Sequence, residues 1–215
     1  MRVMKEGFLY TFGFPPLRSM LLLLALVSLR AMPTMVLMPV MAKDILHGGA
    51  HTFGFLVTAS GCGALAGAMY LASRKSVLGL SRIIVFGSAL FGTSLIIFAL
   101  SRISWLSLLL MVVVGFGMTL SVTPSNTVIQ TIVDEDKRGR VMSFYSMAHF
   151  GTMPLGSLLA GSLAQMIGAP ATIMIGGVAC ILGAIMFAIK LPSLIKMIRP
   201  IYVKKGIIVE EQVGN

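Results

Sequence analysis

The amino-acid sequence predicts an all-α membrane protein with six transmembrane helices, and three observations support this fold class. First, 57% of the 215 residues are hydrophobic and only 11% are charged, whereas a typical soluble domain carries about 25% charged residues. Second, the apolar residues gather in six runs, each long enough to cross the hydrocarbon core of a bilayer. Third, the basic residues stand almost entirely on one side of these runs, as is typical of cytoplasmic loops.

The length of the six runs favours helices over the strands of a barrel. A helical span needs about 20 apolar residues, and the sequence lacks the alternating segments of about ten residues that are typical of membrane barrels. We therefore expect helices at approximately Leu17–Met41, Thr52–Ala72, Ile83–Leu100, Trp105–Gln130, Val141–Ile167 and Ala169–Leu191. Residues 1–16 then form an interfacial lead-in, residues 17–191 the helical bundle, and residues 192–215 a cytoplasmic tail.

The distribution of Lys and Arg predicts the orientation of the bundle. Of the 17 basic residues, 14 lie before or at the start of the first run, at or after the end of the sixth, or in the loops after the second and fourth runs. Only Lys43 and Arg102 lie in loops on the other side. By the positive-inside rule, both termini are expected in the cytoplasm of a multi-pass cell-membrane protein. An even number of spans also requires both termini on one side.

The composition argues against several other classes of protein. A net charge of +10 would suggest nucleic acid in a soluble protein, but here the basic residues separate apolar runs. Cys62 and Cys180 lie inside such runs without paired spacing, so we expect two small buried residues rather than a disulfide or metal site. The sequence also lacks a Ser/His/Asp set and a phosphate-binding loop. We expect no nucleic-acid partner, no enzymatic activity, no metal and no cofactor.

Small residues recur every four positions on several of the predicted helices. Ala59, Gly63 and Gly67 form one such face, and Gly176, Cys180 and Ala184 form another. Residues four apart share a helix face, and small ones allow neighbouring backbones to approach closely. Packing within the bundle is the simplest interpretation.

A polar stripe runs along the fourth predicted helix. Its members are spaced by four, three and four residues, which places them on one face: Thr119, Thr123, Asn126 and Gln130. Unsatisfied amides facing lipid cost several kcal/mol, roughly the cost of a lost buried hydrogen bond. The stripe must therefore face protein or water. Interhelical hydrogen bonding and a substrate-contacting cavity wall both fit this pattern.

Arg30 is the one fully charged side chain deep within a predicted span, and Thr34 follows it one turn later on the same face. No Asp or Glu occurs within any of the six runs. A buried Arg indicates a functional site or a structural pair. We expect Arg30 to face a water-filled cavity, to bind an anionic group, or to pair with a segment outside this sequence.

His149 lies in the fifth predicted span, one turn after Tyr145. A titratable imidazole at this depth is suited to relaying a proton. The alternative is a hydrogen-bonded packing residue, which the lack of acidic neighbours favours. Both residues are candidates for the wall of a substrate cavity.

The loop before the fifth span, and the span itself, resemble a known family. Asp134–Tyr145 reads DEDKRGRVMSFY, and Gly151–Gly168 reads GTMPLGSLLAGSLAQMIG. This pattern resembles the major facilitator superfamily and, more narrowly, the second half of drug and siderophore exporters of the enterobactin-exporter and macrolide-efflux type. Three other pieces resemble the same region: KEGFLY at Lys5–Tyr10, LMPVMAKDIL at Leu37–Leu46 and GFLVTASGCGALAGA at Gly54–Ala68.

The resemblance implies a twelve-helix transporter built from two six-helix halves around a central cavity. The present sequence resembles helices seven to twelve, starting within the loop that joins the halves. The resemblance also implies efflux of a drug-like or siderophore-like small molecule by proton antiport.

The resemblance assigns roles to two groups of residues. A cytoplasmic gating loop would comprise Asp134, Asp136, Arg138, Gly139 and Arg140, with its arginines paired to nearby acids and helix ends. From the residues alone, these arginines set topology and form a local salt bridge with Asp134 or Asp136. A helix-bending motif in the fifth span would comprise Gly151, Pro154, Gly156 and Gly161.

Three functional hypotheses follow. The first is a six-helix half of an exporter that is incomplete without an N-terminal six-helix half. The second is a self-sufficient six-span transporter that acts as a homodimer and supplies both cavity walls by two-fold symmetry. The third is a non-transporting accessory membrane subunit. The partners expected under these hypotheses are the lipid bilayer, the other half or a second copy, and a small-molecule substrate.

Overall fold

A computed structural model describes residues 10–74 and 76–207, apart from the side chains of residues 30–33. Its regular structure within these residues is entirely helical. The elements are α2 (Pro15–Val40), η1 (Met41–Ile45), α3 (Ala50–Ala72), α4 (Leu80–Leu100), α5 (Ser104–Ile132), α6 (Glu135–Ser146), η2 (Met147–Gly151), α7 (Thr152–Ile167) and α8 (Ala169–Lys204). Both η segments are π-helical. The all-α fold class is confirmed.

Five helices among the described residues are long and apolar enough to cross a membrane: Pro15–Ile45, Ala50–Ala72, Leu80–Leu100, Ser104–Ile132 and Ala169–Lys204. They coincide with five of the six predicted spans. The remaining prediction, the fifth span at Val141–Ile167, falls on a helical path that is divided into α6, η2 and α7. α7 alone has 16 residues, which is shorter than the roughly 20 residues of a typical span.

The last helix extends well beyond its predicted end. The apolar run ends at Leu191, but α8 continues through Pro192 and Pro200 to Lys204. Leu194, Ile198 and Tyr202 are all buried. Their spacing of four residues gives α8 an inward apolar face, which explains why the helix continues where the hydropathy falls. The tail predicted for residues 192–215 therefore contributes helical turns to the bundle.

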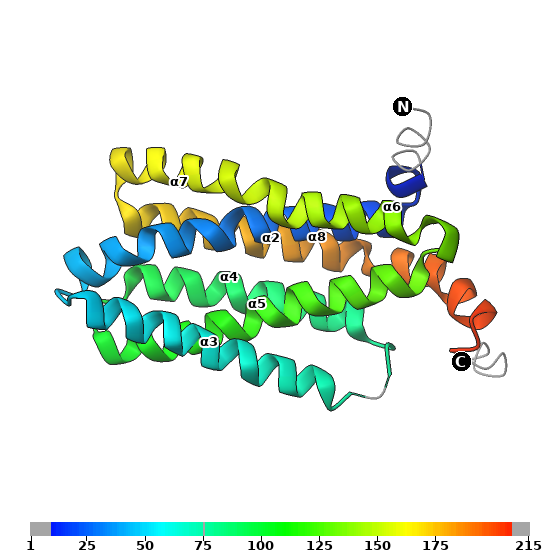
Figure 1. Ribbon diagram of the computed structural model, residues 1–215, viewed down its shortest axis with the longest axis horizontal. Helices are drawn as coiled ribbons and strands as arrows, with labels where there is room; N and C mark the ends of the chain where they lie inside the picture. The colour runs from blue at the N-terminus through cyan, green and yellow to red at the C-terminus, as the bar shows by residue number, and fades with distance from the viewer. Residues whose placement is uncertain (1–9, 75, 208–215) are drawn as a thin grey trace.

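The described ends of the chain lie at the same end of the bundle (Figure 1). The connections between α3 and α4 and between α5 and α6 lie there too, whereas the connections before α3, between α4 and α5, and between α7 and α8 lie at the opposite end. The loops rich in Lys and Arg are thus at the end that carries the termini.

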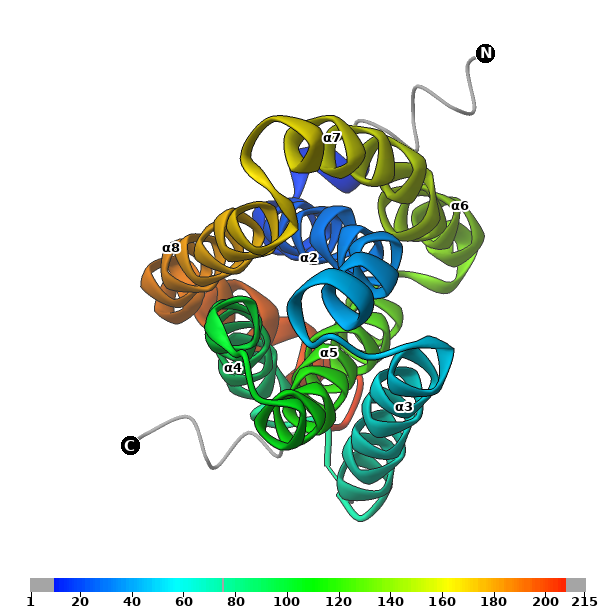
Figure 2. The ribbon, with the colours of Figure 1, turned by 90° about the vertical axis from the view of Figure 1, so that its left-hand side faces the viewer.

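The helices pack in a pattern that repeats within the chain. α5 packs against α3 and α4, and α2 correspondingly packs against α7 and α8, while α4 and α8 pack against each other. Exchanging α2 with α5, α3 with α7, and α4 with α8 therefore reproduces the main packing pairs. Figure 2 shows α2 and α5 in the middle, α4 and α8 together on one side, and α3 and α7 as separate flanks.

Glycines set the closest helix crossings. A Cβ atom at Gly92 of α4 would lie 2.7 Å from the Gly177 carbonyl oxygen of α8, and a Cβ at Gly87 would lie 2.7 Å from Leu120 Cβ of α5. These distances leave no room for a side chain, so only glycine permits the approach. A Cβ atom at Gly63 of α3 would likewise collide with the backbone of α5. The predicted packing role of Gly63 is thus confirmed.

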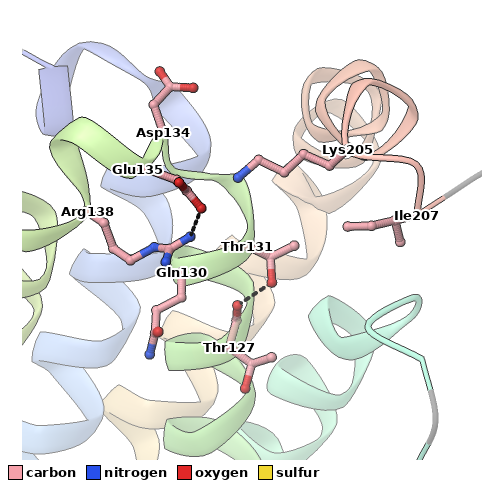
Figure 3. A pocket seen from close by; sticks show the side chains of 8 residues that line it. All are labelled: Thr127, Gln130, Thr131, Asp134, Glu135, Arg138, Lys205 and Ile207. Atoms are coloured by element: carbon pink, nitrogen blue, oxygen red, sulfur yellow. Dashed lines mark hydrogen bonds and ion pairs between the residues drawn. The ribbon is translucent and has the colours of Figure 1, made fainter.

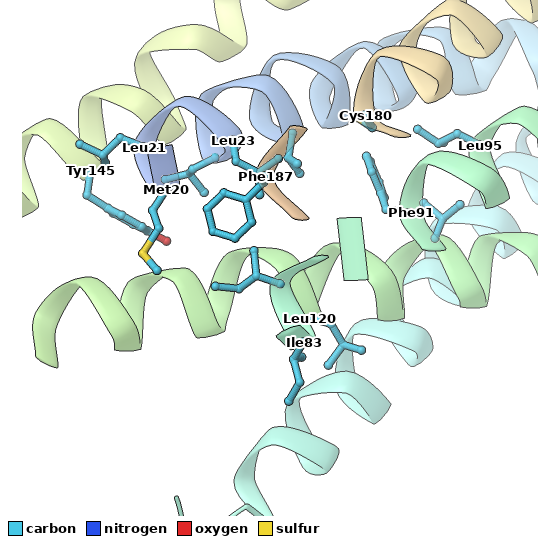
Figure 4. Packing of buried hydrophobic residues seen from close by; sticks show 14 of the residues in the cluster. Met20, Leu21, Leu23, Ile83, Phe91, Leu95, Leu120, Tyr145, Cys180 and Phe187 are labelled. Atoms are coloured by element: carbon cyan, nitrogen blue, oxygen red, sulfur yellow. The ribbon is translucent and has the colours of Figure 1, made fainter. Parts of the chain in front are cut away.

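The apolar core fills the space between α2, α4, α5 and α8 (Figure 4). Phe91 and Leu95 of α4 and Cys180 of α8 are each no more than 1% exposed. Cys180 is therefore a small buried residue, as predicted. The same prediction is wrong for Cys62, which is exposed. Cys62 directly precedes Gly63 in α3. Gly63 faces α5, whereas Cys62 lies on the side of α3 that no described helix covers.

Candidate functional site

A cavity of about 730 Å³ opens at the end of the bundle that carries the termini (Figure 3). We call it the end cavity. Its walls come from the end of α5, the start of α6 and the residues that follow α8: Thr127, Gln130, Thr131, Asp134, Glu135, Arg138, Lys205 and Ile207. Both acidic and basic side chains line it, so it is suited to polar or charged groups.

The charges of the end cavity are arranged by the first turn of α6. Arg138 Nη2 lies 3.7 Å from Glu135 Oε1, and Lys137 Nζ lies 3.8 Å from Asp134 Oδ2. The sequence predicted Asp134 or Asp136 as the partner of the arginines. The structure places Glu135 against Arg138 because residues three apart share a helix face. Such exposed pairs contribute about 0.2–1 kcal/mol.

Two further features bear on what the end cavity can bind. Arg138 Nε is buried and has no hydrogen-bond partner within the described part of the chain. Arg138 therefore retains a donor for an additional acceptor. Lys205 Nζ donates a hydrogen bond at 2.9 Å to the carbonyl oxygen of Val133, the residue that follows α5. Arg140, the other arginine of the RGR triplet, is exposed on α6 with Gly139.

The segment before α2 packs on this region. The Tyr10 hydroxyl donates to Asp134 Oδ2 at 3.2 Å, Lys137 Nζ lies 4.4 Å from the centre of the Tyr10 ring, and the Phe12 ring meets Phe144 edge-on at 6.2 Å. The sequence predicted that residues 1–16 form an interfacial lead-in. In the structure, Tyr10 and Phe12 tie the described part of this lead-in to α6 and to the turn between α5 and α6.

The contact between Tyr10 and Asp134 predicts a pH-dependent stability. Burial, and then the Asp134 carboxylate, raise the pKa of the Tyr10 phenol above its ordinary value. The neutral phenol is thus favoured in the folded chain, so its contribution is complete below the ordinary pKa and is lost as the pH rises through the raised one. We expect Tyr10→Phe to cost about 1 kcal/mol at neutral pH.

Two measurements check this prediction. Phenolate absorbance, taken as the difference between the wild-type chain and Tyr10→Phe, should show a group that ionises above the ordinary tyrosine range. Thermal unfolding should show a smaller difference between the two proteins in strong alkali than at neutral pH. A Tyr10 that ionises at the ordinary pKa would contradict the contact.

A line of polar side chains leads from the end cavity into the bundle. Ser28 Oγ of α2 lies 2.6 Å from His149 Nδ1 of η2, and the His149 ring stacks on Tyr145 with centres 6.3 Å apart. The Tyr145 hydroxyl donates to the Val122 carbonyl oxygen at 3.3 Å and also has the Asn126 side chain as a partner. The Asn126 amide oxygen accepts a hydrogen bond from Gln130, which lines the end cavity. We call Ser28, His149, Tyr145, Asn126 and Gln130 the polar line.

The structure thus joins four of the predicted cavity residues, Asn126, Gln130, Tyr145 and His149, and places Thr119 and Thr123 against other neighbours. Thr119 bonds the Gly115 carbonyl of its own helix and packs against Gly67 of α3. Thr123 lines a different cavity of about 170 Å³, beside α3 and α4. Thr34 is buried in α2. The Arg30 side chain lies outside the described residues.

His149 lies in η2, the π-helical segment that separates α6 from α7. η2 has the wider turn of a π-helix, a local feature that is frequent at functional sites, and it ends at Gly151. Pro154 lies in the first turn of α7, where a proline is tolerated. Gly156 is buried against the Leu29 backbone of α2, whereas a Cβ atom at Gly161 would meet no other atom within 4 Å. The predicted bending motif therefore begins where the helical path changes.

Sequence reasoning missed three residues of this region. Glu135 pairs with Arg138, Lys205 lines the end cavity, and Ser28 is 0% exposed yet bonded to His149. The signal for Ser28 was a single hydroxyl in an apolar run of leucines, which costs free energy unless it finds a partner. In the described part of the chain, no three His, Cys, Asp or Glu side chains gather as a metal site requires.

Apolar helices of spanning length, with a polar line between them, define a multi-pass membrane protein. A family model described as transmembrane secretion effector, from the major facilitator superfamily, matches residues 1–201. The chain belongs to this family of transporters. It is also 26% identical over 145 residues to the staphyloferrin A transporter of Staphylococcus aureus (strain NCTC 8325 / PS 47). The match covers 67% of this chain and 36% of that relative, so the chain spans well under two thirds of the relative's length.

Proposed function

We propose that the chain forms one half of a secondary transporter, with helices equivalent to seven to twelve, that exports a siderophore-like or drug-like small molecule by proton antiport. The family description, which refers to secretion, supports export. The similarity to a staphyloferrin A transporter supports a siderophore-like substrate. The excess of Lys and Arg at one end of the bundle supports a cell-membrane location with both termini in the cytoplasm.

The observation that carries this proposal is the repeated packing of the helices. Nested repeats of three helices are expected within each half of a major facilitator transporter, and the substrate site is expected at the interface between repeats near the midplane. Exchange of α2–α3–α4 with α5–α6/α7–α8 reproduces the main packing pairs of the bundle. On this assignment, the divided path through α6, η2 and α7 is the fifth of six spans.

The uncovered flank of α3 supports the need for a partner. α3 buries only 17% of its most apolar stretch, against 56% for α4. A helix at the outside of a complete bundle and a helix that meets a second half would both show such a face. α3, however, lies next to α5, which carries Asn126 and Gln130 of the polar line, and therefore lies where a second cavity wall would meet the first.

In the proposed transporter, the polar line and the end cavity form one wall of the translocation pathway. Asn126, Gln130 and Tyr145 offer both donors and acceptors to a polar substrate group. The buried Nε of Arg138 offers a charged donor to an anionic group at the end of the pathway. Arg30 and Thr34 remain proposed members of the same wall.

His149 is the proposed proton carrier. Proton coupling needs a group within the membrane that changes its protonation, and the predicted spans contain no carboxylate. An imidazole can fill this role. The contact between His149 and Ser28 joins η2 to the central helix α2. A change in the charge of His149 would therefore alter the interface between α2 and η2.

The proposal is tested by transport. The transcript upstream of the Met1 codon should be sequenced, and any product with six apolar spans should be co-expressed with this chain. Liposomes with an imposed pH gradient are then loaded with staphyloferrin A or with ethidium as an amphipathic cation. We expect gradient-driven transport with both proteins and none with this chain alone. Transport by the chain alone would overturn its incompleteness and favour a homodimer. Altered function of a co-expressed transporter, without any effect of Asn126→Ala, would favour an accessory subunit.

The two cysteines provide a built-in probe of the α3 flank. Cys62 is exposed on α3 and Cys180 is buried in α8, so in detergent solution N-ethylmaleimide should modify the first and spare the second. If α3 meets a partner half, co-assembly should slow the modification of Cys62 severalfold because the thiol becomes covered. The Cys62→Ser variant should show no labelling, which controls for Cys180. Unchanged labelling of Cys62 in a transporting assembly would place the interface elsewhere.

A further inference from the structure

A second cavity lies at the end of the bundle that carries the termini, away from the polar line. It has a volume of about 360 Å³ and lies between the start of α4 and the last turns of α8. Arg82 of α4 and Arg199 of α8 both line it, together with Leu78, Ile195, Ile198 and Tyr202. None of the residues that line it is acidic. It therefore combines two guanidinium groups from different helices with apolar walls.

This combination selects the chemistry of a ligand. Guanidinium groups bind phosphate with paired, charge-assisted hydrogen bonds, whereas aliphatic side chains gain nothing from a free inorganic anion. Leu78 and Ile195 are 39% and 38% exposed, so the apolar wall is continuous with the outer surface of the bundle. A ligand that fits has a phosphate and an attached apolar portion.

The surface leading away from the cavity is apolar along the direction of the span. Phe86 follows Arg82 by one turn of α4 and is 58% exposed, and Ile97 is exposed further along the same helix. Acyl chains packed beside these side chains would leave a headgroup at the level of Arg82 and Arg199.

We propose that this cavity binds the headgroup of an anionic phospholipid of the leaflet on the side of the termini, with Arg82 and Arg199 contacting its phosphate. Basic pockets between transmembrane helices on the cytoplasmic side are suited to anionic lipid headgroups. The bound lipid would join α4 to α8, which are already in close contact at Gly92 and Gly177. The site is independent of the transported substrate.

The test is thermal unfolding of the full chain in detergent with phosphatidylglycerol, with phosphatidylcholine of the same acyl chains, or with inorganic phosphate. At about ten times the dissociation constant, phosphatidylglycerol should raise the melting temperature by roughly 3–6 °C. Phosphatidylcholine and inorganic phosphate should have little effect. An equal shift with inorganic phosphate would identify a free-anion site and overturn the lipid assignment, as would an equal shift with phosphatidylcholine.

Two variants locate the site. Arg82→Gln with Arg199→Gln should remove the shift specific to phosphatidylglycerol, and each single change should weaken lipid binding about five-fold. Lys196→Gln is the matched control, because it removes a positive charge from an exposed position of α8 that does not line the cavity. An undiminished shift in the double variant would overturn the proposal. If that variant fails to fold, Arg82→Gln and Arg82→Lys are compared, and Arg82→Lys, which keeps the positive charge, should weaken lipid binding less than the roughly five-fold loss expected for Arg82→Gln.

Discussion

His149→Gln is expected to abolish transport driven by a pH gradient while leaving the chain folded. Gln keeps a hydrogen-bonding partner for the buried Ser28 hydroxyl, which lies 2.6 Å from His149 Nδ1 in the wild-type chain, but it cannot carry a proton near neutral pH. Initial rates in liposomes, measured in the assembly that transports, should therefore fall to the background of empty liposomes.

A second substitution separates the proton from the packing. His149→Phe removes both the titratable group and the hydrogen bond, so it leaves Ser28 Oγ buried without its partner. Such a loss costs about 1–3 kcal/mol, whereas His149→Gln should stay within about 1 kcal/mol of the wild-type chain. If His149→Gln transports at the wild-type rate, the imidazole is a packing residue and the proton follows another route.

Gly63→Val is expected to give the largest loss of stability among single substitutions on α3. A Cβ atom at this position would collide with the Val112 carbonyl oxygen of α5 and lie 3.0 Å from the Phe116 nitrogen. Because these are backbone atoms of a packed helix, α3 must move away from α5 to admit the side chain. Overpacking typically costs about 1–3 kcal/mol, which corresponds to a fall in melting temperature of roughly 2–12 °C.

Gly61→Val is the matched control for this prediction. It makes the same chemical change two residues earlier on the same helix, where no atom lies within 4 Å of the added Cβ. Its melting temperature should equal or exceed that of the wild-type chain, since valine is a better helix former than glycine. Equal destabilisation by the two variants would mean that α3 does not approach α5 as closely as the structure places it.

How far the sequence predicts the structure differs from helix to helix. Five spans were predictable because each is a continuous apolar run of the length that a bilayer demands. The path through α6, η2 and α7 was predicted as one span, Val141–Ile167, with a bending motif that begins at Gly151. Hydropathy does not record the change to a π-helix at Met147–Gly151. The end of α8 was misplaced for a different reason, since Leu194, Ile198 and Tyr202 hold it by packing after the continuous apolar run has ended.

The candidate site shows the same division. The spacing of the four residues predicted one polar face of α5: Thr119, Thr123, Asn126 and Gln130. In the structure, α3 packs on Thr119, whereas Asn126 is a partner of Tyr145. Ser28 and His149 are 121 residues apart in the chain. Their contact depends on how α2 and η2 are turned toward each other, which no local pattern encodes.

The sequence by itself determined that this is a helical membrane protein, approximately where five of its helices lie, and which end carries the basic loops. These properties depend on hydropathy and charge, which each residue carries wherever it lies. Only the tertiary structure decided which polar side chains meet. An α-helix turns about 100° per residue, so a π-helical turn, or a glycine contact that sets a crossing, redirects every side chain beyond it.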